Sequence, residues 1–129
     1  MNRAASRPVH RGFLAALKSA GRGLRDAFRS EPNLRIQGAI GAAAVAVSLW
    51  LGTGTAVVLL CCGLVIVSEL LNTALEHLAD AVHPSPHPLV GAAKDTAAGA
   101  VLVSAVAATL VGLVSLGPAL LQRLAGWLP

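Results

Sequence analysis

The sequence predicts an all-α integral membrane protein with an N-terminal amphipathic surface helix and three transmembrane helices. Hydrophobic residues make up 55% of the chain, charged residues only 12%, and the mean hydropathy is +0.70. Three long apolar stretches are separated by one glycine-containing turn and one proline-rich loop. Aromatic residues are scarce, at 3%, which disfavours a soluble core built around aromatic anchors. A length of 129 residues fits a single domain, expected over 1–129.

Residues 10–30 are expected to form the surface helix. Apolar residues recur at helical spacing along this segment, and basic residues recur on another side. The apolar positions are Phe13, Leu14, Leu17, Leu24 and Phe28, and the basic positions are Lys18, Arg22, Arg25 and Arg29. This pattern is typical of a helix that lies in a membrane interface. A helix packed on the protein's own core is an equally open interpretation. The repeated basic residues disfavour a signal peptide.

The first two transmembrane helices are expected over 34–51 and 55–81. GTGT at 52–55 is an uncharged turn, short enough to make the two helices antiparallel. The second helix meets no helix breaker before Pro84, so it runs for roughly 28 residues, or about 42 Å. The apolar core of a bilayer is only about 30 Å thick. One end of this helix, the acidic one, is therefore expected to extend into water.

The third transmembrane helix is expected over 96–116, after the proline-rich loop HPSPHP at 83–88 and with Pro118 marking its end. Basic residues then predict the orientation. Eight lie in the segment that ends at Arg35 and one, Lys94, lies near the loop, whereas Arg123 alone lies on the opposite side. By the positive-inside rule, the N-terminus and the proline-rich loop face the cytoplasm.

Glu69, Asn72, Glu76 and Asp80 occupy one face of the second helix. At 100° per residue they project at roughly 0°, 300°, 340° and 20°. Glu76 and Asp80 are expected near the membrane surface and Glu69 about two turns deeper. A charged group at that depth costs about 2.5 kcal/mol or more on insertion scales, which marks a functional site by default. The alternative is a hydrogen-bonded cluster that only joins helices.

Carboxylates beside an amide suit Mg²⁺, which takes oxygen ligands and often bridges to substrate phosphates. Lys94 and Asp95 enter the membrane on the same side, and the segment EPNLR adds Glu31, Asn33 and Arg35. Such a set fits phosphoryl transfer, because it offers metal ligands, cations for the phosphates and a base for a hydroxyl. A zinc site is the weaker interpretation, since the histidines match no closed zinc pattern; they are His77, His83 and His87.

Three motifs together resemble the prokaryotic diacylglycerol kinase family, whose members include undecaprenol kinases. They are ExNxR before the first span, ELLNTALEHLAD in the second helix and HPLVGAAKDTAAGAVL leading into the third. The resemblance covers about residues 12–112. It implies a bacterial inner-membrane, multi-pass and homotrimeric lipid kinase with a cytoplasmic active site. Such an enzyme moves the γ-phosphate of ATP onto the hydroxyl of diacylglycerol or undecaprenol.

The resemblance also implies a role for each matching position. Glu69 resembles the catalytic base, and Glu31 and Glu76 resemble the ligands of Mg²⁺. The positions that resemble those around the nucleotide and its phosphates are Asn72, Lys94, Asp95, Asp80 and His87. Arg35 matches the family's basic position beside the first span. Gln37 departs from the pattern, because many relatives of the undecaprenol kinase branch have histidine there.

Two other function classes remain open from the residues alone. A small ion-coupled transporter or channel subunit would also carry an acid inside the membrane. A structural or regulatory membrane subunit could bind a larger partner through the surface helix. The acceptor lipid is not fixed by the sequence, because apolar surfaces discriminate weakly between chains. Nucleic acid is not expected as a partner.

Overall fold

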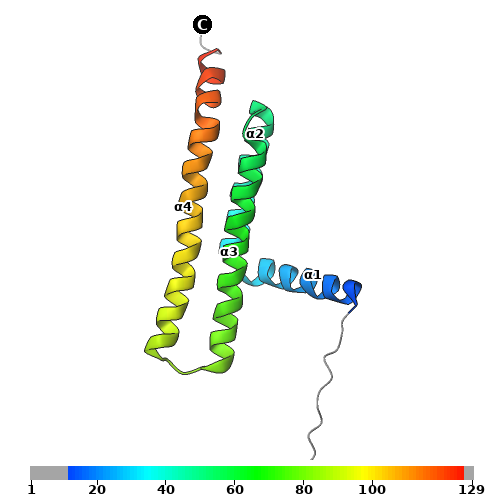
Figure 1. Ribbon diagram of the computed structural model, residues 1–129, viewed down its shortest axis with the longest axis vertical. Helices are drawn as coiled ribbons and strands as arrows, with labels where there is room; N and C mark the ends of the chain where they lie inside the picture. Colours follow the sequence, from blue (N-terminus) through cyan, green and yellow to red (C-terminus); the bar gives the residue numbers. More distant parts are fainter. Residues whose placement is uncertain (1–11, 127–129) are drawn as a thin grey trace, which may run out of the picture.

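The computed structural model describes residues 12–126 and is helical throughout, with short connections (Figure 1). The four helices are α1 (Phe13–Ser30), α2 (Pro32–Leu51), α3 (Thr55–Val82) and α4 (Pro88–Ala125). Helices α2, α3 and α4 are each long and apolar enough to cross a membrane. The all-helical class and the three candidate spans are thus confirmed.

The three long helices lie along one another, and α1 runs across them (Figure 1). The turn after α2 reverses the chain into α3, and the loop after α3 reverses it again into α4. Helix α3 packs against both α2 and α4 and is therefore the centre of the bundle. Only Glu31 separates α1 from α2, so the change of direction between these two helices occurs within one residue.

The bundle core is narrow and is made mainly of small and branched side chains. Leu34 and Ser48 are completely buried, and Val58, Val65 and Val101 are nearly so. Small residues let the helices approach closely, as is usual in membrane bundles. Most large apolar side chains of α2, α3 and α4 point outward. Lipid tails are as apolar as leucine, so an outward leucine loses little in a bilayer.

Polar contacts join the helices inside the apolar part of the bundle, among them one between α3 and α4 and one between α2 and α3. The hydroxyl groups of Ser68 and Ser104 lie 2.7 Å apart and link α3 to α4. The thiol of Cys62 lies 3.9 Å from the carbonyl oxygen of Gly41, where α2 meets α3. A Cβ atom on Gly41 would lie 3.2 Å from that sulfur. Glycine at this position therefore allows the close approach of the two helices.

Helix α4 corrects the expected end of the third transmembrane helix. It begins at Pro88 and continues through Pro118 to Ala125, so the prediction that Pro118 ends the helix is wrong. A proline ring clashes with the Cβ of the preceding residue and so disfavours helical geometry there. The residue before Pro118 is Gly117, which has no Cβ. Pro88, expected in the loop, is instead the first helical residue, a position that suits its fixed φ. Of the expected surface helix, residues 10 and 11 lie outside the described part of the chain.

The turn between α2 and α3 depends on two glycines in the left-handed region. Gly52 has φ 71° and ends α2, and Gly54 has φ 69° and precedes α3. A Cβ on Gly52 would meet nothing within 4 Å, whereas one on Gly54 would lie 3.0 Å from Leu116 Cδ2 and 3.4 Å from Ser115 Cβ. A side chain would strain the backbone at both positions. Only at Gly54 would it also crowd neighbouring atoms.

We expect Gly54→Ala to destabilise the protein more than Gly52→Ala. Alanine in the left-handed region costs roughly 1 kcal/mol at either position, and crowding against α4 adds about 1 kcal/mol at Gly54. Unfolding by increasing sodium dodecyl sulfate in mixed micelles would measure both losses. Equal losses would mean that Leu116 moves aside freely and that the contact with α4 imposes no constraint.

Candidate functional site

Glu69 is the deepest acidic group of the described chain. It lies in the middle of α3 and is only 4% exposed. Its Oε2 accepts a hydrogen bond from Nε2 of Gln37 on α2, at 3.3 Å. The packing of α2 against α3 therefore supplies the partner that a buried carboxylate needs.

Asn72 and Glu76 follow Glu69 on the same helix and form a pair. Asn72 Nδ2 donates to Glu76 Oε1 at 3.1 Å, one helical turn away. Asn72 Oδ1 is buried and has no hydrogen-bond partner among the described residues. Both side chains are half-buried. The pair thus presents an unused amide oxygen next to a carboxylate.

Asp80 completes this face of α3 at its exposed end. The carboxylate forms an ion pair with Nζ of Lys94 on α4, which connects the two helices beyond the loop. From Glu69 to Asp80 the acidic groups pass from buried, through half-buried, to exposed. The helical spacing in the sequence predicted this shared face, and the structure adds the cation that meets its outer end.

Asp95 and His87 lie near the beginning of α4. Asp95 is exposed on the first turns of the helix, beside Lys94. His87 is the N-cap residue, and its Nδ1 accepts a hydrogen bond from the backbone N–H of Leu89 at 3.2 Å. Its ring also lies 5.0 Å from that of His83, between centroids. His87 therefore has a structural role in starting α4.

Two of the predicted site residues lie at the junction of α1 and α2. Glu31 is half-buried, and its backbone N–H donates to Ala27 at the end of α1. Arg35 is exposed, and its Nη1 donates to the carbonyl oxygen of Arg29 at 3.0 Å. This bond satisfies a carbonyl group in the last turn of α1. Arg35 thus stabilises the junction between the two helices.

The described residues contain no group of three or more His, Cys, Asp or Glu side chains placed to hold one metal ion. The predicted ligands Glu31 and Glu76 are therefore not part of a closed metal cage. The same holds for the histidines considered for zinc. A metal ion at this face would need ligands besides these carboxylates.

Gln37 is the site residue that sequence reasoning missed. In the sequence, Gln37 stands out only as a departure from the pattern of relatives. Besides its bond to Glu69, it has a buried Oε1 without a hydrogen-bond partner in the part of the chain that the structure describes. A polar residue at this depth was the available signal; its partner depends on how α2 packs on α3.

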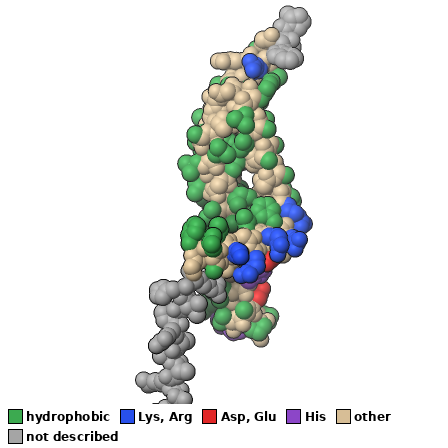
Figure 2. Space-filling model, turned by 90° about the vertical axis from the view of Figure 1, so that its right-hand side faces the viewer, with side chains coloured by type: hydrophobic (Ala, Val, Ile, Leu, Met, Phe, Trp, Pro, Cys, Tyr) green, Lys and Arg blue, Asp and Glu red, His purple; other side chains and the backbone are tan. Residues whose placement is uncertain are grey.

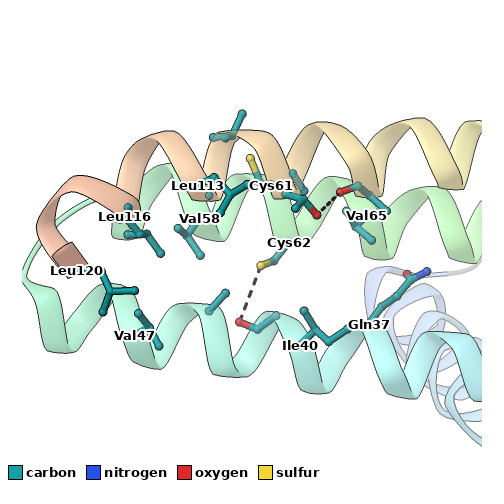
Figure 3. A pocket seen from close by; sticks show the side chains of 18 residues that line it. Gln37, Ile40, Val47, Val58, Cys61, Cys62, Val65, Leu113, Leu116 and Leu120 are labelled. Atoms are coloured by element: carbon teal, nitrogen blue, oxygen red, sulfur yellow. Dashed lines mark hydrogen bonds between the residues drawn. The ribbon is translucent and has the colours of Figure 1, made fainter. Parts of the chain in front are cut away.

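An apolar groove of about 420 Å³ leads to this residue. It lies between α2, α3 and α4, and its walls include Val47, Val58 and Cys61. Figure 3 shows Gln37 at one end of the groove and Leu116 and Leu120 toward the other. The groove is therefore a hydrocarbon surface with an amide group at one end.

The charges are distributed unevenly along the bundle. Figure 2 shows Lys and Arg side chains gathered near the level of α1, with Asp, Glu and His side chains close to them. Near the opposite end, the basic residue of the described chain is Arg123, whose guanidinium carbon lies 5.4 Å from the ring centroid of Trp50. The acidic face of α3 thus opens at the basic end of the molecule.

Three candidate spans, a buried carboxylate and an acidic face that opens at one end define a multi-pass membrane protein with a polar site built into its bundle. The model of the prokaryotic diacylglycerol kinase family matches residues 18–116. The chain belongs to this family of lipid kinases, so the resemblance in its motifs is confirmed.

Individual relatives match over most of the chain. Undecaprenol kinase of Bacillus subtilis is 36% identical over 116 residues, which cover 84% of this chain and 90% of the relative. Diacylglycerol kinase of Synechocystis is 42% identical over 114 residues, or 85% of this chain, but this match spans only 65% of the relative. Diacylglycerol kinase of Escherichia coli is 35% identical over 105 residues, covering 77% of this chain and 86% of the relative.

Proposed function

We propose that the chain transfers the γ-phosphate of ATP to the hydroxyl group of a membrane lipid, either diacylglycerol or undecaprenol. The observation that carries the proposal is the position of Glu69. It is buried on the face of α3 that continues to the exposed Asp80, and its partner Gln37 lines the apolar groove. One helix therefore extends from the lipid layer, which the acceptor lipid does not leave, to water, where ATP is found.

Glu69 is proposed as the catalytic base. Its carboxylate accepts the proton of the lipid hydroxyl as the hydroxyl oxygen attacks the γ-phosphorus. The bond between this phosphorus and the oxygen that bridges to the β-phosphate breaks, and ADP leaves with that oxygen. Such transfer depends mainly on alignment and charge stabilisation. The structure supports this role through the depth of Glu69 and its contact with Gln37.

The remaining acidic face fits a magnesium ion bound together with ATP. Magnesium commonly takes one or two carboxylates and completes its shell with water and phosphate oxygens. The unpartnered Oδ1 of Asn72 and the adjacent carboxylate of Glu76 are oxygen donors of this kind, and Glu31 is proposed as the other carboxylate. The ion would neutralise charge on the transferring phosphate when bound. Protein ligands that leave coordination positions free suit a magnesium ion that binds together with ATP.

The cation and acids at the outer end are proposed to receive the nucleotide. Lys94 is proposed to bind phosphate oxygens of the nucleotide, and this contact would replace its ion pair with Asp80. Asp80, Asp95 and His87 are proposed to border the nucleotide at the mouth of the site. Arg35 is proposed to support the site through the junction of α1 and α2, where it holds the last turn of α1.

We also propose how the protein sits in the membrane. The exposed apolar side chains of α1, which include Phe13, Leu14 and Leu17, suit the interface of a bilayer, with the basic side chains toward water. The basic end of the bundle is proposed to face the cytoplasm of a bacterial inner membrane. Many outward apolar side chains of α2, α3 and α4 leave surface for lipid or for other subunits, and the proposed assembly is a homotrimer.

Phosphate transfer from γ-labelled ATP by the detergent-purified protein tests the proposed function. Diacylglycerol and undecaprenol are offered separately and together, each with and without Mg²⁺. We expect labelling of at least one lipid, dependent on Mg²⁺, and a preference in the mixture would identify the acceptor. Folded protein that labels neither lipid would refute the proposal. An ion-coupled transporter would instead move protons across vesicles without ATP.

A further inference from the structure

Gln37 has two polar ends, of which one has a partner within residues 12–126. Its Nε2 donates to Glu69 Oε2 at 3.3 Å. The proposed base acts as a carboxylate, whose two oxygens only accept hydrogen bonds, so the amide turns its nitrogen toward Glu69 and its oxygen away. The orientation of the amide is therefore set by chemistry.

The other end of the amide is an unused acceptor. Oε1 of Gln37 is buried and makes no hydrogen bond within residues 12–126. A buried acceptor without a donor costs about 1 to 3 kcal/mol, so such a group indicates a donor supplied from outside the described residues. Gln37 lines the apolar groove, otherwise bordered mainly by Ala, Val, Leu and Gly residues.

A lipid alcohol is the ligand that fits this arrangement. Its hydrocarbon chain matches the groove, and its hydroxyl group is a donor that can reach an amide oxygen at the groove's polar end. A water molecule could donate to Oε1 but would not fill the adjoining apolar groove. The same amide touches Glu69, so a hydroxyl held there is brought next to the proposed base.

We propose that Gln37 binds the hydroxyl group of the acceptor lipid through Oε1 and positions Glu69 through Nε2. The inference rests on the proposed function and extends it to a residue outside the acidic face of α3. The acceptor hydroxyl first donates to Gln37, and its proton passes to Glu69 when the oxygen attacks the γ-phosphorus. No proton moves to or from Gln37 itself.

The test compares Gln37→Met with Gln37→His in the purified full-length protein, with diacylglycerol and undecaprenol as the acceptors. Methionine keeps the length of the side chain and removes both polar ends. We expect kcat to fall about 10- to 100-fold, because the base loses its alignment. The KM for the lipid should rise about fivefold, the equivalent of one hydrogen bond, while the KM for ATP stays the same.

Histidine retains an N–H donor and a ring-nitrogen acceptor. Gln37→His should therefore recover kcat to within about threefold of the wild type by the same reasoning. Gln122→Met is the matched control, since Gln122 is the chain's other glutamine and lies exposed near the end of α4. Its kinetics should equal those of the wild type. If Gln37→Met aggregates, Gln37→Ala replaces it with the same expected kinetics.

Each outcome separates this inference from the proposed function. Wild-type protein that phosphorylates no lipid refutes both. Active wild-type protein with a Gln37→Met variant as active as Gln122→Met refutes the inference alone. An equal rise in the KM for ATP and for the lipid, or a Gln37→His variant as impaired as Gln37→Met, would also refute it, since either result indicates a general structural role.

Discussion

Glu69→Gln is expected to reduce lipid phosphorylation about 10³-fold, within the range that a general base contributes. Glutamine has the same shape and can still meet Gln37, since each amide offers both a donor and an acceptor. It cannot accept the proton of the lipid hydroxyl. The expected loss is therefore in kcat, with the KM for ATP and the KM for the lipid changed little.

Two controls distinguish a lost base from a lost fold. Asp26→Asn removes the charge of an exposed acid on α1 and should leave kcat unchanged. Circular dichroism and the elution volume in detergent should be the same for wild type and both variants. A Glu69→Gln enzyme within tenfold of wild-type kcat would exclude Glu69 as the base and would favour a purely structural role for its contact with Gln37.

Regular helix geometry explains which parts of this site are accessible from sequence. Glu69, Asn72, Glu76 and Asp80 share a face because 3.6 residues make one turn, and this holds in any packing of α3. The pairing of Asn72 with Glu76 follows from the same spacing, since residues four apart are neighbours on a helix. The depth of Glu69 was likewise predictable, from its distance to the polar end of the helix.

Contacts between helices could not be predicted in the same way. The bond between Gln37 and Glu69 depends on the register of α2 against α3, which small residues such as Gly41 set by allowing close approach. The pairing of Asp80 with Lys94 depends on how the loop returns the chain. The predicted end of α4 is wrong because the helix continues through Pro118, where the preceding residue, Gly117, has no Cβ to clash with the proline ring.

The groove shows the same division between local pattern and packing. Its walls are mainly alanine, valine, leucine and glycine residues, which in sequence resemble any membrane helix. Only the arrangement of three helices makes these residues one surface that ends at Gln37. The residues of a lipid site can therefore lie outside every sequence motif and still be next to the residues that the motifs identify.

Glu76→Gln is the second change with a large expected effect. Glutamine retains the Oε1 atom that accepts the hydrogen bond from Asn72. It replaces a charged metal ligand with a neutral one, so affinity for Mg²⁺ should fall. We expect kcat/KM for ATP at a fixed, moderate Mg²⁺ concentration to fall about 10²-fold, at the upper end of the loss that even outer-shell changes cause at metal sites. The Mg²⁺ concentration for half-maximal activity should rise about tenfold by the same reasoning.

This shift in the Mg²⁺ requirement shows whether Glu76 binds the magnesium ion or only lies near it. Glu76→Asp, which keeps the charge on a shorter side chain, should lie between the wild type and Glu76→Gln in both measurements. His77→Gln alters the next residue, which is exposed, and should change neither. If activity falls in Glu76→Gln while the Mg²⁺ dependence stays at its wild-type value, the ion is held elsewhere and Glu76 acts through Asn72 on the shape of the face.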